Sequence, residues 1–480
     1  MEPAGSQPFT TPPSSLAAPP QVAAPPQVVA PPQVAAPPVE FCPVCKRPAP
    51  PDQFGFVECA CGWGGPGDPV EAARGFSRWV TLRDRRLATG IARRELARIA
   101  KTGKPTSARN LLYVVLLSLL SVAIYLIVGA LFVGSVVLFV QTVTAENWVG
   151  AILVGMIVLY LFWALFGLPH KIEGIVAPIA DYPRLAATMG EIAARVGVKP
   201  PRWVVLAPDA DFWITRKMLW GRALTPQIVV AVGAAALTQM NDPELRAVLT
   251  HELTHYRREH TFFTRFFGGA EQALDHIIDG VKAGISTNYR NDRYARRRSS
   301  SSLPVLVGVV IIWMVTLPLR LLWFVLHLLR MRLSRSDEYE ADRMAIQTYG
   351  ARSFTQGLMA VISTYETLRG AGESIVSDMK RRNNPNLYAE LRRHYAELPP
   401  DAIERMRWRA VKGYRSLEQT HPITPDRVRA ALLIATPEPA LPFRLQPVSN
   451  IITPADAPDA SEVELRLTQI IFARGKRRRR

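Results

Sequence analysis

Two long apolar runs stand out from an otherwise mixed chain. Residues 111–140 and 148–168 contain no charged side chain, and a helix of about 20 apolar residues is long enough to cross the core of a bilayer. The pattern therefore predicts transmembrane helices over 110–140 and 148–168. A buried hairpin in a soluble core is the weaker alternative. A third apolar run covers residues 303–329.

Basic residues flank these runs unevenly. The segment 71–109 is rich in Arg and Lys, whereas QTVTAEN, the short connection between the first two runs, contains neither. Positively charged flanks tend to stay on the cytoplasmic side of a membrane. We therefore expect a basic juxtamembrane segment over 71–109, a cytoplasmic N-terminus and a cytoplasmic domain after residue 168. The chain is thus predicted to be a multi-pass protein of the cell membrane.

Composition and charge refine this picture. The 480 residues carry a net charge of +18, and a sequence pI near 10.1 suggests an anionic partner. Many basic side chains lie beside the apolar runs, and others form a basic C-terminal tail within 441–480. The lipid bilayer is therefore the nearer anionic surface. Nucleic-acid binding would explain the charge but not the apolar runs, so no specific nucleic-acid partner is expected.

Residues 1–40 repeat a Pro-rich motif, APPQVA. Such sequences favour extended polyproline conformations and cannot bury a core, so the pattern predicts a disordered or semi-rigid arm. The arm could dock onto a proline-binding protein partner. A plain spacer is the simpler interpretation.

All the cysteines follow directly, in two tight pairs within 41–66. They are Cys42, Cys45, Cys59 and Cys61. Four thiolates at this spacing, with Gly and Pro in the turns, suit one tetrahedral zinc ion. A reducing cytoplasm disfavours disulfides. The pattern predicts a structural zinc ribbon, although its second pair is one residue tighter than the usual spacing.

The strongest chemical signal is the segment HELTH. Asp242 and Pro243 are typical of a helix start, and on that helix His251 and His255 are four residues apart, which places them on one face. Two imidazoles in this arrangement can bind one zinc ion. Glu252 beside them can act as general base toward the water that the ion activates.

A catalytic zinc usually takes three protein ligands. The segment SRSDEYEADRMA places Glu338 and Asp342 four residues apart on a predicted helix. Glu338 can supply the third ligand, with Glu340 as a competing candidate, while Asp342 can hydrogen-bond a zinc-bound imidazole. His260 and His276 show no comparable spacing and are interpreted as ordinary polar residues.

An apolar strand is predicted over 226–233, just before the zinc helix. At the edge of a small sheet, its residues Val229, Ala231 and Gly233 could pair with an extended substrate segment. An internal strand is an equally good interpretation of the same pattern.

These motifs together resemble the membrane zinc peptidases of the HtpX and CAAX prenyl protease type. The likeness rests on HELTH, on EYEAD further along the chain and on the strand PQIVVAVG, and it covers roughly residues 170–435. The resemblance implies a largely helical gluzincin domain with a small edge sheet, in two parts over 170–300 and 330–440. It also implies a zinc ion bound by the two His of HELTH and the first Glu of EYEAD. The Glu of HELTH would be the base, and the Asp of EYEAD would support a ligand.

Another element resembles the same family. His421-Pro422 with Arg427 matches its HP-x4-R element. His421 could stabilise the oxyanion that forms when water attacks, although a His beside Pro in a loop is more often a turn residue. Thr254 and the stretch AAALTQM depart from the family pattern, which affects local packing and not the ligands.

The zinc site constrains the third apolar run. A single crossing over 303–329 would place Glu338 across the membrane from His255, and the two could not share an ion. Pro318 and Arg320 interrupt the run, and both of its flanks are basic. We therefore expect a re-entrant segment or a helical hairpin bent near Pro318. A pair of short, tilted helices is the alternative.

The sequence thus predicts an integral-membrane, mainly α (α+β) zinc peptidase with an N-terminal zinc ribbon. Its expected activity is zinc-dependent endoproteolysis of membrane-associated or misfolded proteins on the cytoplasmic side. The alternative is a non-catalytic membrane adaptor that keeps zinc as structure and recruits partners through the ribbon and the Pro-rich arm. Glu252 favours the enzyme, because a purely structural metal site needs no general base.

Overall fold

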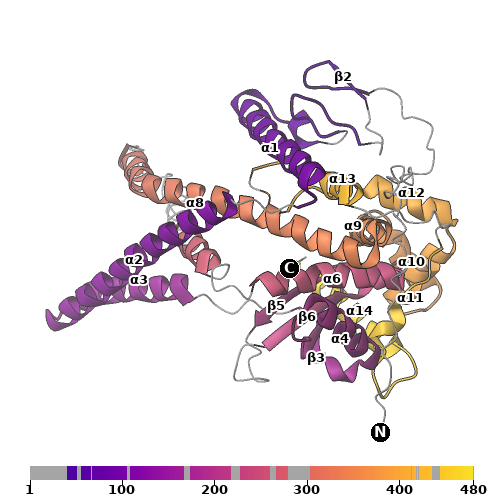
Figure 1. The fold of residues 1–480 in the computed structure, drawn as a ribbon. Helices are drawn as coiled ribbons and strands as arrows, with labels where there is room; N and C mark the ends of the chain where they lie inside the picture. Colours follow the sequence, from indigo (N-terminus) through magenta and orange to yellow (C-terminus); the bar gives the residue numbers. More distant parts are fainter. Residues whose placement is uncertain are drawn as a thin grey trace, which may run out of the picture.

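A small sheet, a group of central helices and a projecting helical bundle make up the molecule (Figure 1). The computed structural model describes residues 40–50, 56–65, 68–104, 109–166, 173–217, 227–259, 266–278, 303–411, 413, 415–417, 419, 421–434 and 444–478. Apart from its last residue, the predicted Pro-rich arm lies outside the described residues. In Figure 1 the N-terminal cysteine-containing segment and the sheet lie on opposite sides of the central helices.

The sheet has four strands in the order β3-β4-β6-β5. They are β3 (Ile175–Pro178), β4 (Trp203–Ala207), β5 (Trp213–Lys217) and β6 (Gln227–Gly233). The central pair, β4 and β6, is parallel, and the two outer strands are antiparallel to their neighbours. Runs of β-branched residues in β4 and β6 suit strands that are covered on both faces.

Of the two interpretations of β6, the internal strand is confirmed and the sheet edge is wrong. β5 pairs along one side of β6 and β4 along the other, so Val229, Ala231 and Gly233 lie on an internal, buried strand. Close packing requires a glycine at position 233, because an added Cβ would lie 2.4 Å from the backbone carbonyl carbon of Ala210. The apolar pattern of β6 therefore reflects burial and leaves no backbone edge for a substrate.

Helices surround this sheet and form most of the core. In chain order they are α4 (Pro183–Val196), α5 (Ala234–Leu237), α6 (Asp242–Glu259), α8 (Leu303–Tyr349), α9 (Ala351–Gly370), α10 (Gly372–Arg381), α11 (Leu387–Ala396), α12 (Pro400–Ala410), α13 (Thr424–Ile434) and α14 (Ser461–Arg478). Short 3-10 turns cover Pro69–Glu71, Ile179–Asp181 and Ser449–Ile452. The helix α6 contacts α4, α8 and α9, so it is enclosed on several sides. The largest core cluster joins it to β4, β6, α4, α11 and α14.

A separate bundle contains the apolar helices α2 (Arg109–Thr144) and α3 (Trp148–Phe166). Within the described part of the chain, one helix is long and apolar enough to cross a membrane, over Leu111–Thr144, and the apolar helix Trp148–Phe162 is shorter. Both lie where the sequence predicts apolar helices. Their outer side chains are largely exposed, for example Leu126 at 68%. In Figure 1 the two helices extend away from the central helices.

The predicted hairpin over 303–329 is wrong. This run is the first part of α8, a single helix of 47 residues that continues through Pro318. Residues from Leu319 to Leu333 pack against α2 and against a helix over residues 266–278, and this packing offsets the lost backbone hydrogen bond at the proline.

The constraint behind the hairpin prediction is met in another way. The helix over residues 266–278 already lies in the bundle, where the Tyr125 hydroxyl donates to the Phe266 carbonyl at 3.0 Å. The chain therefore enters the bundle after α6 and leaves it along α8. Both metal-ligand motifs consequently lie in the same domain.

Much of the basic segment before α2 is helical. It forms α1 (Gly75–Thr102), which packs on α13, with Ala88, Ala92 and Ile99 buried. A buried ion pair between Arg85 and Asp68 fastens α1 to the cysteine-containing segment, which also contains the strands β1 (Glu40–Phe41) and β2 (Pro48–Ala49).

A buried arginine fixes the start of α6. The Arg407 side chain on α12 is fully buried and donates to both carboxylate oxygens of Glu244 at 3.0 and 3.1 Å, to Gln356 at 3.0 Å and to the Gln239 carbonyl. Glu244 in turn accepts from the Asn241 amide at 3.0 Å in the first turn of α6. The start of the helix that carries HELTH is thus anchored through a buried ionic contact.

Replacement of Arg407 by Ala should destabilise the fold strongly. The change leaves the Glu244 carboxylate buried without its cation, a loss typically worth about 3–5 kcal/mol. Arg405→Ala on the same helix is the matched control, because Arg405 is 39% exposed and, among the described residues, pairs with Asp401 four residues away, which predicts a loss below about 1 kcal/mol. Denaturant midpoints of the detergent-solubilised proteins measure both effects. Equal midpoints for the two variants would contradict the anchoring role.

Candidate active site

The helix α6 presents its HELTH residues toward α8. Its opposite face buries Leu245, Leu249 and Leu253 in the core, which sets the rotation of the helix. His251 and His255 are therefore held on the other face, with their Nε2 atoms 3.0 Å apart and their rings nearly perpendicular. The local pattern predicted from the sequence thus yields two convergent imidazoles.

The second part of the site comes from α8. Glu338 Oε1 lies 3.1 Å from His255 Nε2, and Oε2 lies 3.5 Å from His251 Nε2. The Glu338 side chain is buried, and its Oε2 atom has no hydrogen-bond partner among the described residues. Three potential ligand atoms from two helices therefore converge within 4.8 Å of one another.

These separations fit a zinc ion. Bonds of 2.0–2.2 Å at tetrahedral angles place two ligand atoms about 3.4 Å apart. The two Nε2 atoms are 3.0 Å apart, and a Glu338 oxygen lies 3.1 Å from His255 (Oε1) and 3.5 Å from His251 (Oε2). The unpartnered oxygen of Glu338 also suits a ligand that bonds to a cation. The donor set of two imidazoles and one carboxylate leaves a fourth position for water or substrate.

Glu340, the competing candidate, belongs to a different contact. Its carboxylate accepts from Arg343 Nε at 3.1 Å and forms an ion pair with that residue. It therefore takes no part in the three-residue metal group, which contains Glu338.

Asp342 contacts the Nδ1 atom of His251. Its Oδ1 atom lies 2.9 Å from His251 Nδ1, and Arg427 on α13 donates to both Asp342 oxygens, at 3.0 Å from Nε and 2.6 Å from the terminal nitrogen. Asp342 is fully buried, and the Arg427 guanidinium also lies 5.5 Å from the centre of the Phe354 ring. A proton on Nδ1 leaves the Nε2 lone pair free for a metal.

His421 reaches the site from the segment before α13. Its Nδ1 atom lies 2.8 Å from Glu338 Oε1, while its side chain remains 65% exposed. Sequence reasoning from residue spacing could not find this approach, because a single His-Pro in a loop has no periodic signal. Only the resemblance to HP-x4-R pointed to His421 and Arg427.

Burial and charge set the protonation of the site. Burial and the nearby Arg427 lower the pKa of His251 to about 4, so its ring is neutral. Burial opposes the charged form of His255, but the hydrogen bond and charge of Glu338 outweigh this and raise its pKa to about 9. Burial raises the pKa of Glu252 to about 7. A carboxyl that titrates near neutrality can both accept and return a proton.

The four cysteines form a second group. Cys42 and Cys61 have their sulfur atoms 3.5 Å apart, and those of Cys45 and Cys59 are 3.3 Å apart. All four are free thiols whose sulfur atoms lie within 4.8 Å of one another. Zinc–sulfur bonds of 2.3 Å would place the sulfurs about 3.8 Å apart, so the group fits one tetrahedral zinc. We call residues 40–65, which carry it, the ribbon.

His276 lies apart from this chemistry. The carbonyl of His276 accepts a hydrogen bond from the Tyr160 hydroxyl in the apolar bundle, and His276 is absent from both metal groups. His260 lies outside the described residues.

Substitutions on α8 should distinguish the zinc ligand Glu338 from Asp342, which orients another ligand. Glu338→Ala is expected to lose the catalytic zinc, and Asp342→Ala to weaken zinc binding about 10- to 100-fold, because Asp342 orients His251 without reaching the ion. Glu340→Ala is the matched control and should bind zinc normally. Chelator competition with metal analysis measures all three. Loss of zinc from Glu340→Ala with retention in Glu338→Ala would overturn the ligand assignment.

Comparison with known proteins agrees with this geometry. The model of peptidase family M48 matches residues 181–434. A protease HtpX homolog from Pyrobaculum calidifontis is 25% identical over 253 residues, which cover 52% of this chain and 67% of that protein. One from Archaeoglobus fulgidus is 23% identical over 246 residues, covering 51% and 66%. The chain thus spans about two thirds of these relatives.

A solved structure is similar only distantly. The crystal structure of S. mikatae Ste24p is 15% identical, covers 75% of this chain and 76% of that one, and gives a TM-score of 0.29. This likeness is too weak for a comparison of the folds. The sequence relatives and the family match confirm the resemblance that the motifs indicated.

Proposed function

Because the chain belongs to peptidase family M48, we propose that it is a zinc-dependent endopeptidase that hydrolyses membrane-associated or misfolded proteins. The observation that carries this proposal is the convergence of His251, His255 and Glu338 with Glu252 beside them. Two imidazoles and a carboxylate would hold the ion, and a carboxyl with a pKa of about 7 lies next to the first ligand in the chain.

The protein groups around this centre can be assigned roles. A zinc ion held there would polarise the peptide carbonyl and make water acidic enough to attack near neutral pH. Glu252 takes a proton from the attacking water and returns it to the leaving amine. Asp342 keeps the proton of His251 on Nδ1, and Arg427 holds Asp342 in place. His421 is exposed beside Glu338, where it can donate to the developing oxyanion.

The substrate backbone has a different docking edge from the one expected. β5 is the terminal strand of the described sheet on the side of β6, and it contacts α6. An extended segment that pairs with β5 would run beside the HELTH helix. We therefore assign the substrate-pairing role to Trp213–Lys217 and withdraw it from β6.

The apolar bundle supports a membrane location. Side chains such as Leu111, Leu119 and Leu126 are 65–71% exposed on α2, and lipid is the solvent in which such a surface is stable. The charge asymmetry around α2 supports a cytoplasmic N-terminus and a cytoplasmic peptidase domain. The protein would then be a multi-pass protein of the cell membrane that acts on its cytoplasmic side.

A non-catalytic adaptor is the other candidate. It would recruit partners through the ribbon and the Pro-rich arm and keep the zinc as structure. Such a site would not require Glu252, or an exposed His421 beside the carboxylate ligand. The enzyme therefore accounts for more of the observed groups.

Glu252→Gln should abolish peptide hydrolysis and retain both zinc ions, because the amide cannot accept the proton of water while the ligands are unchanged. Glu366→Gln, at an exposed position of α9, is the control and should cleave at the normal rate. Turnover of a quenched fluorescent protein substrate and metal content are measured together. Normal turnover by Glu252→Gln with full zinc would contradict its role as base.

The membrane topology can be tested with single added cysteines. Ala145→Cys lies in the exposed turn between α2 and α3, and Ser377→Cys is exposed on α10. An impermeant thiol reagent added to intact cells should label the first variant only, and both after permeabilisation. The parent protein is the control for the four native thiols. Labelling of Ser377→Cys in intact cells would refute the cytoplasmic peptidase domain.

A further inference from the structure

The ribbon is docked on the peptidase domain close to the HP-x4-R element. Phe56 is buried against Met359, Val411 and Val428, and its ring lies 6.0 Å from that of Trp408. These partners come from α9, from the end of α12 and from α13. The ribbon thus places an aromatic side chain among α9, α12 and α13, and apolar contacts hold it there.

A second contact between the same parts is ionic. Glu58, next to Cys59, accepts from the two terminal nitrogens of Arg415 at 2.9 and 3.0 Å and from Arg429 at 2.8 Å. Asp426 accepts from the same two arginines, at 2.7 Å from Arg415 Nε and 2.9 Å from Arg429. Two carboxylates and two guanidiniums therefore form one cluster, in which Asp426 is almost completely buried.

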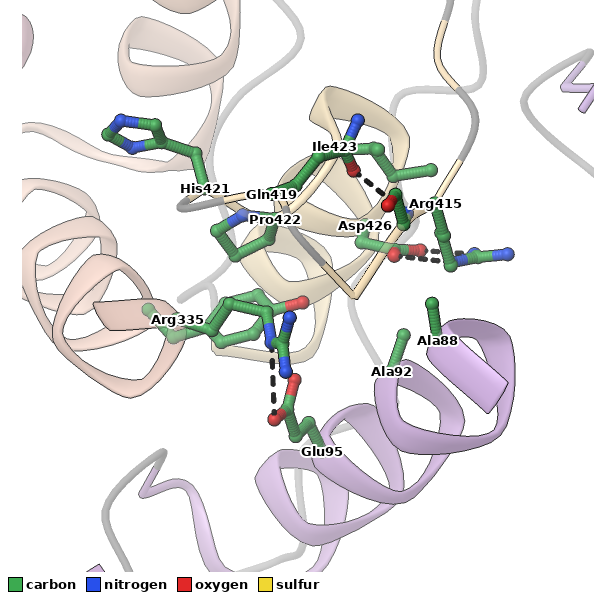
Figure 2. A pocket seen from close by; sticks show the side chains of 12 residues that line it. Ala88, Ala92, Glu95, Arg335, Arg415, Gln419, His421, Pro422, Ile423 and Asp426 are labelled. Carbon is green, nitrogen blue, oxygen red and sulfur yellow. Dashed lines mark hydrogen bonds and ion pairs between the residues drawn. The ribbon is translucent and has the colours of Figure 1, made fainter. Parts of the chain in front are cut away.

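In the chain, residues of this cluster lie on both sides of His421. His421 lies between Arg415 and Asp426 in the chain, and Arg427 directly follows Asp426. Figure 2 shows Arg415 paired with Asp426 on one side of a pocket, with the His421 side chain turned away from them. The ends of the His421 segment are thus joined to each other and to Glu58.

The helix α1 adds a further tether. The Asp84 carboxylate accepts from the Leu417 amide at 3.1 Å, within the same segment. On its other side α1 is bound to the ribbon, because Arg86 Nε donates to the Cys61 carbonyl at 3.2 Å. The Cys59 and Cys61 turn, α1 and the His421 segment are consequently packed as one unit.

Glu58 balances the positive charges of Arg415 and Arg429 in this unit. Without it, Arg415 would keep the Asp426 carboxylate as its ionic partner among the described residues, although its guanidinium is largely buried. A buried cation that loses one of its two carboxylate partners draws in water or moves the backbone. Either change acts first on Asp426 and the adjacent Arg427, whose two bonds hold Asp342 against His251.

We propose that the ribbon is a working part of the catalytic centre, in which Glu58 is a positioning residue for Arg427 and His421. It acts through Arg415 and Asp426 and touches neither the substrate nor the ligands. The inference rests on the proposed peptidase function for its kinetic consequence, whereas its effect on the zinc ligand His251 is independent of turnover. Binding of metal by the cysteines, which orders the turn that carries Glu58, would thereby support activity at a distance.

Glu58→Gln tests the proposal in the full-length, zinc-loaded protein. Because Glu58 lies outside the ligand set, we expect zinc affinity of the catalytic site and kcat each to fall about 10-fold, with KM changed less than about 2-fold. Glu58→Asp keeps the charge and should recover most of both. Glu71→Gln is the matched control, since the Glu71 carboxylate lies beside the ribbon, accepts a hydrogen bond from Trp63 Nε1 at 2.8 Å and, among the residues that the structure describes, makes no ion pair with the segment around His421. It should leave both quantities unchanged.

These measurements distinguish the positioning role of Glu58 from the proposed peptidase function. Unchanged zinc affinity and kcat in Glu58→Gln, or equal losses in Glu58→Gln and Glu71→Gln, would overturn the positioning role. Weaker zinc binding in a protein that cleaves no substrate even as wild type would uphold the positioning role and refute the peptidase function. Unfolding midpoints accompany each variant, and a loss that the Asp variant fails to recover would assign Glu58 to fold stability alone and also overturn the proposal.

Discussion

The packing of α6 against α8 is the contact on which the rest of the structure depends. It brings a carboxylate from one helix within 3.1 and 3.5 Å of two imidazoles on the other, in a buried place where unpaired charge is costly. The arrangement is tolerable because each group has an opposite or neutral neighbour. Arg427 offsets the charges of Asp342 and Glu338, and the neutral His251 adds none. The central position of α6 follows from this requirement.

The length of α8 ties this site to the apolar bundle. The same uninterrupted helix packs against α2 through residues such as Leu326 and then supplies Glu338 and Asp342. A continuous helix transmits tilt along its axis, because its backbone hydrogen bonds resist local bending. The position of the third ligand is therefore mechanically linked to the packing of helices that face lipid in the proposed setting. A hairpin ending before Glu338 would have isolated the site from the bundle.

Local and non-local features differ in how far the sequence predicts them. The rotation of α6 and the placement of Glu338 and Asp342 on one face of α8 follow from helical periodicity, and the geometry agrees with both. The edge position of β6 failed because strand order depends on where β5 pairs, which no local pattern records. The break at Pro318 failed because tertiary packing offset a local penalty. The contact of Glu58 with Arg415 had no sequence signal, since 357 residues separate the partners.

Asp342 is the point where supports from two distant parts of the chain meet. Its own helix, α8, comes from the apolar bundle, and its arginine partner is on α13, which is packed against α1 and bonded to the ribbon. Movement of either support changes the hydrogen bond to His251 Nδ1 and hence the direction of its Nε2 lone pair. The family match over residues 181–434 contains every residue of this centre, yet Glu58 and the first part of its support lie before it. The physical unit that sets the ligand geometry is therefore larger than the segment that the family shares.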